Sequence, residues 1–167
     1  MSEKEVPKEE VLKDFRSGVV KLEEAVKGLS EEQLDLSLEP GKWSIRQVVH
    51  HLVDDCDGVS YEIKKALVLG DARISIEGHP GNEAWSATLD FNERKIDSSL
   101  GLIKAHRQYL ADLLNHFSDA WDRTLTILDA DGKEMQKVTI EDVVKMVSDH
   151  MFGHIAKIEE IKEKHGV

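Results

Sequence analysis

TIEDVVKMVSDHMFGHIAKI, residues 139–158, is the stretch that decides the fold. Apolar residues return along it every three or four positions and form one stripe: Ile140, Val143, Val144, Val147, Met151, Ile155 and Ile158. This spacing is typical of an α-helix with one face packed in a core. Thr139, with Asp142 three residues later, is a helix-start signal. The stretch therefore predicts a long helix with one buried face.

Three earlier segments carry stripes of the same kind. They lie in residues 12–29, 44–69 and 92–116. Ser44 is an N-cap candidate for the second segment, and Gly70 ends it. With residues 139–158 they make four long helices, and we predict an all-α four-helix bundle.

The connections between these helices differ in length and character. Ser30-Glu-Glu-Gln opens a short turn as a capping box, and residues 35–42 form a loop. Residues 70–88 are rich in glycine and predict a long crossover loop between the second and third helices, of a length that is often functional. The turn signal at residues 129–132 lies between two strand-like runs, so a small hairpin is expected before the fourth helix.

Composition limits the classes of protein that this chain fits. Its 167 residues suit one domain, residues 1–167, and 40% hydrophobic with 33% charged residues is ordinary for a globular chain. A net charge of −11 argues against nucleic-acid binding. Neither a signal peptide nor an apolar run long enough to cross a membrane is found. Cys56 is the single cysteine, so no intrachain disulfide forms, and we expect a cytoplasmic protein.

Two histidines stand in the segment that decides the fold. His150 and His154 are four residues apart, so on a helix they lie one above the other on the same face. Two imidazoles so placed can hold one divalent ion, and a third from another helix would leave an open coordination position. The alternative is two packed histidines whose spacing has no function.

The third histidine must come from the second helix, where the sequence leaves the choice open. His50 and His51 lie at similar angles on opposite sides of the apolar stripe. His51, Asp55 and Gly58 share one flank of the helix with Glu62. That flank is either the polar wall of a cleft, in which Glu62 would bind substrate, or a solvated face.

Arg107 and Trp85 are further candidates for the site. Arg107 falls near the centre of the third apolar stripe, where a buried charge needs a partner. It is either an anion clamp for substrate or a structural group, paired with Asp55 or Glu62 or reaching out to solvent. Trp85 stands in the crossover, where it packs at the end of the bundle or covers a pocket.

Several of these segments together resemble the DinB superfamily. Trp43-Ser44, a histidine eight residues after the tryptophan and the later HxxxH pair match its two helix motifs in order. Gly-Asn-Glu-Ala-Trp at residues 81–85, Ala-His-Arg at 105–107 and Trp-Asp-Arg-Thr at 121–124 resemble the YfiT-like branch.

The resemblance implies a four-helix bundle with a metal held by His51, His150 and His154, and it excludes His50. Zinc or nickel is the implied ion, and the implied activity is that of a metal-dependent hydrolase. Some relatives are S-transferases that use a low-molecular-weight thiol such as bacillithiol, and homodimers are common. The chain departs from the branch at Gly153, where relatives often have another histidine.

The implied site supports more than one chemistry. Three neutral ligands leave a divalent ion able to activate either water or a thiol. Asp54, which matches the family motif, or Asp55, which lies better on the helix, would orient His51 or accept a proton. A small-molecule substrate is expected in either case. The rival hypothesis is a non-catalytic stress or binding protein whose histidines are structural.

Overall fold

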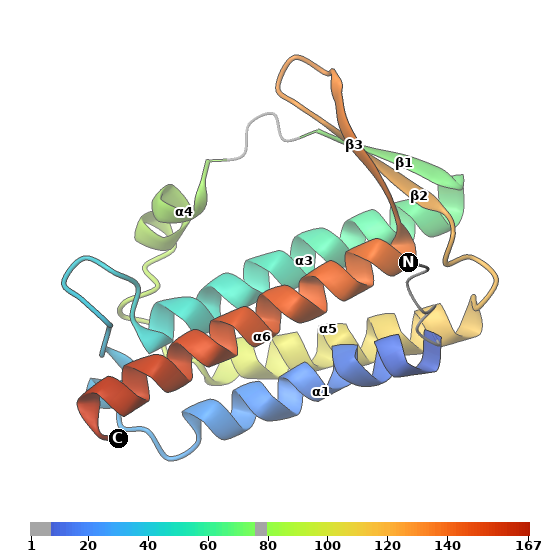
Figure 1. Cartoon of the computed structure of the whole chain (residues 1–167). Coiled ribbons are helices and arrows are strands. Elements are labelled where there is room, and N and C mark those ends of the chain that lie inside the picture. The colour runs from blue at the N-terminus through green and yellow to red at the C-terminus, as the bar shows by residue number, and fades with distance from the viewer. Residues whose placement is uncertain (1–7, 76–79) are drawn as a thin grey trace, which may run out of the picture.

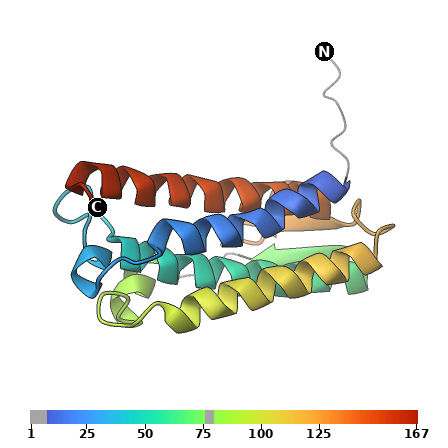
Figure 2. The same cartoon turned by 90° about the horizontal axis from the view of Figure 1, so that it is seen from below.

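Four long helices form the body of the protein. The computed structural model describes residues 8–75 and 80–167. In it α1 (Lys8–Val26), α3 (Ile45–Leu69), α5 (Asp97–His116) and α6 (Ile140–His165) lie side by side (Figures 1 and 2). α1 and α6 run in one direction, and α3 and α5 run in the other (Figure 1). The predicted four-helix bundle is confirmed.

Reciprocal capping boxes begin three of the helices. The side chains of Ser30, Ser44 and Thr139 each accept a hydrogen bond from a backbone N–H three residues later, at the starts of α2 (Glu31–Leu34), α3 and α6. This satisfies N–H groups that the first turn of a helix otherwise leaves unpaired. α5 begins later than predicted, at Asp97 rather than near residue 92, because the intervening residues form turns.

A long crossover does join α3 to α5, but the prediction that it is a loop is wrong for most of its described residues. It contains strand β1 (Asp71–Ser75) and helix α4 (Asn82–Thr88), while residues 76–79 lie outside the described part. β1 pairs in parallel with β2 (Thr124–Leu128), and β2 pairs in antiparallel fashion with β3 (Glu134–Thr139), the second strand of the predicted hairpin. A five-residue strand has little periodicity, and its partner is distant in the sequence, which is why the pattern alone misses it.

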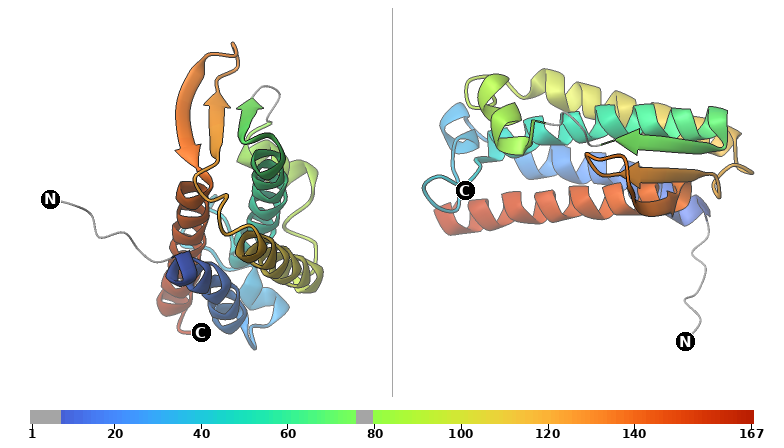
Figure 3. Two further views of the ribbon diagram at one scale, coloured as in Figure 1. Left: turned by 90° about the vertical axis from the view of Figure 1, so that its right-hand side faces the viewer. Right: turned by 90° about the horizontal axis from the view of Figure 1, so that it is seen from above.

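The sheet and α4 lie on the same side of the bundle. Figure 1 shows the sheet over one end of α3 and α4 over the other end. The end-on view in Figure 3 shows the sheet standing off the bundle on the side of α3 and α6. The face that these two helices share is thus bordered by the sheet at one end and by α4 at the other.

The buried apolar side chains form two clusters along the bundle. The cluster at the sheet end includes Phe15, Ile63 and Trp121, and the one at the other end includes Leu22 and Ile158. Between them each long helix contributes small or polar buried residues, namely Gly18 of α1, Ser60 of α3, Arg107 of α5 and Ser148 of α6. We call these four residues, with Asp55 and His150, the middle layer.

Candidate metal centre

His51, His150 and His154 come together at the α3–α6 face. Their ring nitrogens include one atom from each residue, and these three atoms lie within 4.8 Å of one another. Nε2 of His154 lies 3.1 Å from Nε2 of His150, and the rings of His51 and His154 are 4.9 Å apart between centroids. Two imidazole nitrogens on one zinc ion, at about 2.0–2.1 Å each in a tetrahedral site, are about 3.4 Å apart. The three donors therefore suit a single divalent ion.

Asp55 lies directly behind two of these histidines. Its Oδ2 is 3.0 Å from Nδ1 of His150 and 3.3 Å from Nε2 of His51. These distances are those of ion pairs, although neither contact has the angles of a hydrogen bond at Oδ2. A carboxylate behind a histidine fixes its ring orientation and tautomer. With Nδ1 of His150 facing Asp55, its Nε2 is left to face His154.

The electrostatics keep two of the three imidazoles neutral. Burial lowers the pKa of His51, and burial together with His150 and His51 lowers the pKa of His154 to about 4. The contact with Asp55 instead raises the pKa of His150. Burial acts to raise the pKa of Asp55, but the neighbouring histidines outweigh it and hold that pKa below its usual value. A neutral imidazole is the form that binds a metal.

His50, the neighbour of His51, has a structural environment. Its Nδ1 lies 2.8 Å from the hydroxyl of Ser99, and its Nε2 lies 3.1 Å from the backbone oxygen of Arg94. The ring is buried and packs on Phe91. The structure thus separates two histidines that the helical wheel could not.

Two clefts open beside the histidines. The larger, about 490 Å³, is lined by His150 and His154 together with other residues of α6, α4, α3 and the loop before α3: Gly41, Lys42, Trp43, Val48, Glu83, Gly153 and Lys157. The smaller, about 250 Å³, is lined by His51, Asp54 and Asp55 with Asp57, Gly58, Asn82, Trp85 and Phe91. α4 contributes residues to both clefts. A substrate could therefore approach the three histidines from either side of α4.

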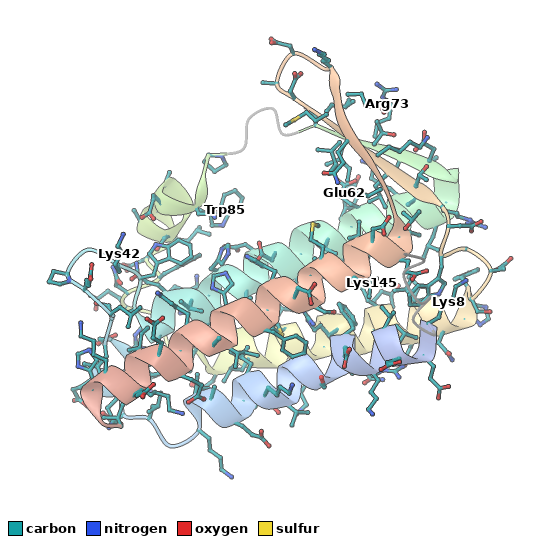
Figure 4. All side chains as sticks on the ribbon, viewed as in Figure 1. Lys8, Lys42, Glu62, Arg73, Trp85 and Lys145 are labelled. Carbon is teal, nitrogen blue, oxygen red and sulfur yellow. The ribbon has the colours of Figure 1, made fainter. Side chains whose placement is uncertain are left out.

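The other predicted site residues lie at different distances from this centre. Asp54 and Trp85 both line the smaller cleft; burial raises the pKa of Asp54, and a hydrogen bond from Trp85 acts against that rise. Glu62 accepts a hydrogen bond from Lys65 at 2.9 Å and lines neither cleft. Figure 4 shows Glu62 near Arg73 at the sheet end, whereas Trp85 lies at the α4 end. The substrate-binding role predicted for Glu62 has no geometric support here and stays a prediction.

Arg107 lies in the middle layer rather than in a cleft. It is 3% exposed, and its terminal nitrogens donate to the backbone oxygens of Phe15 and Val147 at 2.8 Å each. The guanidinium also lies 4.4 Å from the centre of the Phe15 ring. In the described part of the chain it forms no ion pair with Asp55 or Glu62 within 4.0 Å.

Some of the local geometry was not predicted from the sequence. Nδ1 of His106 lies 2.9 Å from the Ser60 hydroxyl, and its Nε2 lies 2.9 Å from Asp57. The edge of the Trp43 ring contacts His51, with 4.9 Å between centroids. Asp57 and Ser60 had no signal, because polar residues on a helix flank are common. Trp43 stands in the resembling motif, but its contact with His51 depends on how the preceding loop folds.

Comparisons with known proteins agree with the fold. The model of the DinB superfamily matches residues 16–158. YfiT of Bacillus subtilis, whose name describes it provisionally as a metal-dependent hydrolase, is 30% identical over 146 residues, which are 87% of this chain and 79% of that protein. A similarly named protein of Oceanobacillus iheyensis is 34% identical over 97 residues, 58% of this chain and 54% of its own length.

Solved structures give the same result. The structure of YfiT, described as an unusual four-helix bundle, superimposes with a TM-score of 0.82 at 26% identity over 99% of this chain and 93% of that one. A mycothiol-dependent maleylpyruvate isomerase matches at 0.68 with 17% identity, over 92% of this chain and 61% of that one, which shows a shared fold alone. Among residues 8–75 and 80–167, no helix has the length and apolar character needed to span a bilayer.

Proposed function

This chain belongs to the DinB superfamily, and we propose that it is a metal-dependent hydrolase with His51, His150 and His154 as its metal ligands. The observation that carries the proposal is the convergence of three imidazole nitrogens within 4.8 Å, next to two clefts. The provisional hydrolase names of the relatives support the same reading. Zinc and nickel both suit imidazole ligands.

The surroundings of the three histidines keep their rings in a form and orientation that suit metal binding. A divalent ion held by three neutral imidazoles acts as a Lewis acid and lowers the pKa of water, which is its usual role in hydrolases. Burial of His51 and His154 keeps both rings in the neutral form near pH 7. Asp55 holds Nδ1 of His150 at 3.0 Å, so the Nε2 lone pair of that ring is directed toward the centre.

The smaller cleft provides a proton acceptor and a cover. Asp54 lines it next to Asp55, and burial raises the pKa of Asp54 toward the range in which a carboxylate exchanges protons with a substrate. Trp85 reaches this cleft from α4 and offers an apolar surface that excludes water from a bound substrate. We therefore assign general-base chemistry to Asp54 and orientation of the ligands to Asp55.

Elemental analysis of the purified protein is the experiment that tests the site. We expect about one zinc or nickel ion per chain, and His51→Ala, His150→Ala and His154→Ala should each lose it. His50→Gln is the matched control, because His50 is an adjacent buried histidine whose partners are Ser99 and a backbone oxygen. This variant should keep the metal.

Two results would overturn the proposal. One is a parent protein that binds no zinc or nickel after reconstitution, and the other is full retention of metal in all three alanine variants. Either would favour the non-catalytic binding protein. A metal-loaded protein should then be screened on activated esters and amides with and without a low-molecular-weight thiol, since turnover that requires the thiol would assign an S-transferase instead.

A further inference from the structure

Nε of Arg107, a buried donor of the middle layer, lacks a hydrogen-bond partner among the described residues. Oδ2 of Asp55 is also buried, and as a carboxylate oxygen it can accept a hydrogen bond beyond its contact with Nδ1 of His150 at 3.0 Å. The other two nitrogens of Arg107 are committed to backbone oxygens of α1 and α6. Leaving a buried donor or acceptor unpaired is costly, and where no protein group reaches such an atom an ordered water usually does.

Arg107 and Asp55 are walls of one small cavity. It has a volume of about 20 Å³ and lies among all four long helices, with Cys56, Ser60 and His150 among its other walls. A single water needs about 10–15 Å³ and two or more polar partners. A guanidinium donor and a carboxylate acceptor are a matched pair for such a water. The Cys56 thiol, also beside the guanidinium, is a weaker partner.

We propose that this cavity is a water site, in which one ordered water accepts a hydrogen bond from Nε of Arg107 and donates one to Oδ2 of Asp55. The water links the guanidinium to the carboxylate that lies 3.0 Å from Nδ1 of His150. Arg107 is then a positioning residue, which acts on His150 through Asp55. The part of this inference that concerns metal affinity rests on the proposed function.

The geometry distinguishes this role from that of a substrate clamp. An anion clamp must present N–H groups to an open cleft, whereas Arg107 is 3% exposed and lines neither cleft beside the histidines. Its fork already spans the bundle from Phe15 to Val147. Gly18 of α1 lies against it, and a Cβ at that position would come within 3.3 Å of an Arg107 nitrogen. The packing thus holds the guanidinium in one place.

The test compares Arg107→Met with Cys56→Ala, which removes the other polar neighbour of the guanidinium. A high-resolution crystal structure of the metal-free parent should show a water within hydrogen-bonding distance of both atoms. Nitrogen NMR of the metal-free parent should show the His150 tautomer protonated at Nδ1. Arg107→Met should lose the water, shift His150 toward a tautomer mixture and weaken zinc binding about five- to tenfold. Cys56→Ala should change zinc affinity less than about twofold.

The outcomes separate this inference from the metal site itself. An empty cavity in the parent, or a folded Arg107→Met variant with the parent's tautomer, overturns the water-linked role whether or not zinc binds. A parent that shows the water and the tautomer but binds no zinc sinks the proposed function and leaves the positioning role standing. If Arg107→Met does not fold, Arg107→Lys keeps the charge but lacks Nε. It should still lose the water, and a retained parental tautomer in that variant would count against the inference.

Discussion

The two apolar ends of the bundle and the middle layer between them are built by the same four helices, yet they differ in every physical respect. The ends bury residues such as Leu22, Ile63 and Ile158 at 0% exposure. The middle layer buries an arginine, two serines and a small cavity, and it adjoins three histidines. Burying polar groups weakens a core unless every one is paired. The difference is that the ends supply most of the apolar burial, whereas the middle layer places polar groups beside the proposed metal ligands.

The first prediction tests whether an apolar end of the bundle supplies stability independently of metal binding. Ile63→Ala removes a fully buried side chain of the sheet-end cluster, and large-to-small changes of this kind cost about 2–5 kcal/mol. We expect the free energy of unfolding to fall by about 3 kcal/mol in urea titrations of the metal-free protein. Zinc affinity measured by calorimetry should stay within about twofold, because sites separated by more than one contact shell act independently. A folded variant with strongly weakened zinc binding would contradict the division into ends and layer.

The second prediction concerns a substitution in the middle layer that leaves both apolar clusters unchanged. Asp55→Asn keeps the shape of the side chain but removes the charge 3.0 Å from Nδ1 of His150. Loss of a carboxylate behind a metal ligand costs about 10–100-fold in affinity, and we expect about thirtyfold. Asp54→Asn is the matched control, because Asp54 is the neighbouring carboxylate and has no ion pair with any of the three histidines in the described structure. If zinc affinity falls equally in both variants, general charge rather than orientation is responsible.

The third prediction concerns the pH dependence of folding stability, which the buried histidines beside the middle layer should cause. In the metal-free protein His154 has a pKa of about 4, below the value of about 6.5 expected in the unfolded chain. Between these values the unfolded state binds a proton that the folded state does not, so stability falls as the pH falls through this window. The lowered pKa of His51 adds to this loss, the raised pKa of His150 changes stability mainly above pH 6.5, and partial exposure of His154 weakens the loss. We expect a net loss of roughly 1–2 kcal/mol from pH 6.5 to pH 4.

Urea midpoints measured across this range with a chelator present would check that prediction. His154→Gln should flatten the profile, since it removes the group that titrates. Stability that does not fall between pH 6.5 and pH 4 would contradict the lowered pKa of His154.

Local spacing decided how much of this could be read from the sequence. The stripe of residues 139–158 predicted α6 and placed His150 and His154 on one face, because both signals depend only on helical periodicity. The choice of His51 over His50 was different. On the wheel the two were equivalent, and only the resemblance chose between them. What separates them in the structure is a partner on another element, Ser99 of α5.

Contacts between distant segments account for what the sequence did not predict. Strand β1 depends on pairing with β2 more than fifty residues later, as in the partners Ala72 and Leu125. The partners of Arg107 are backbone oxygens of α1 and α6, and no pattern of side chains in the sequence predicts such partners. The cavity between Arg107 and Asp55 exists only because the four long helices approach one another at that level. Such features follow from helix packing, so a single chain's periodicity carries no signal for them.

The last prediction compares two helical glycines, one that lines a cleft beside the histidines and one that does not. Gly153 in α6 and Gly101 in α5 both lie inside helices, and a Cβ at either would meet no atom within 4 Å. Glycine costs about 0.5–1 kcal/mol relative to alanine in a helix interior, so Gly153→Ala and Gly101→Ala should each gain about that much stability. Gly153, however, lines the 490 Å³ cleft beside His150 and His154. A methyl group at residue 153 would narrow this cleft, whereas a methyl group at residue 101 would lie outside both clefts.

We therefore expect equal gains in thermal stability and unequal effects on turnover. On the activated ester that the metal-loaded parent hydrolyses best, Gly153→Ala should lower kcat/KM about two- to fivefold, the effect of about one misplaced methyl group. Gly101→Ala should leave it unchanged. Unchanged kcat/KM in Gly153→Ala would mean that substrate enters through the smaller cleft, where Trp85 and Asp54 lie. Gly58→Ala, on the wall of that smaller cleft, should then give the loss instead, because a Cβ there also meets nothing in the folded protein.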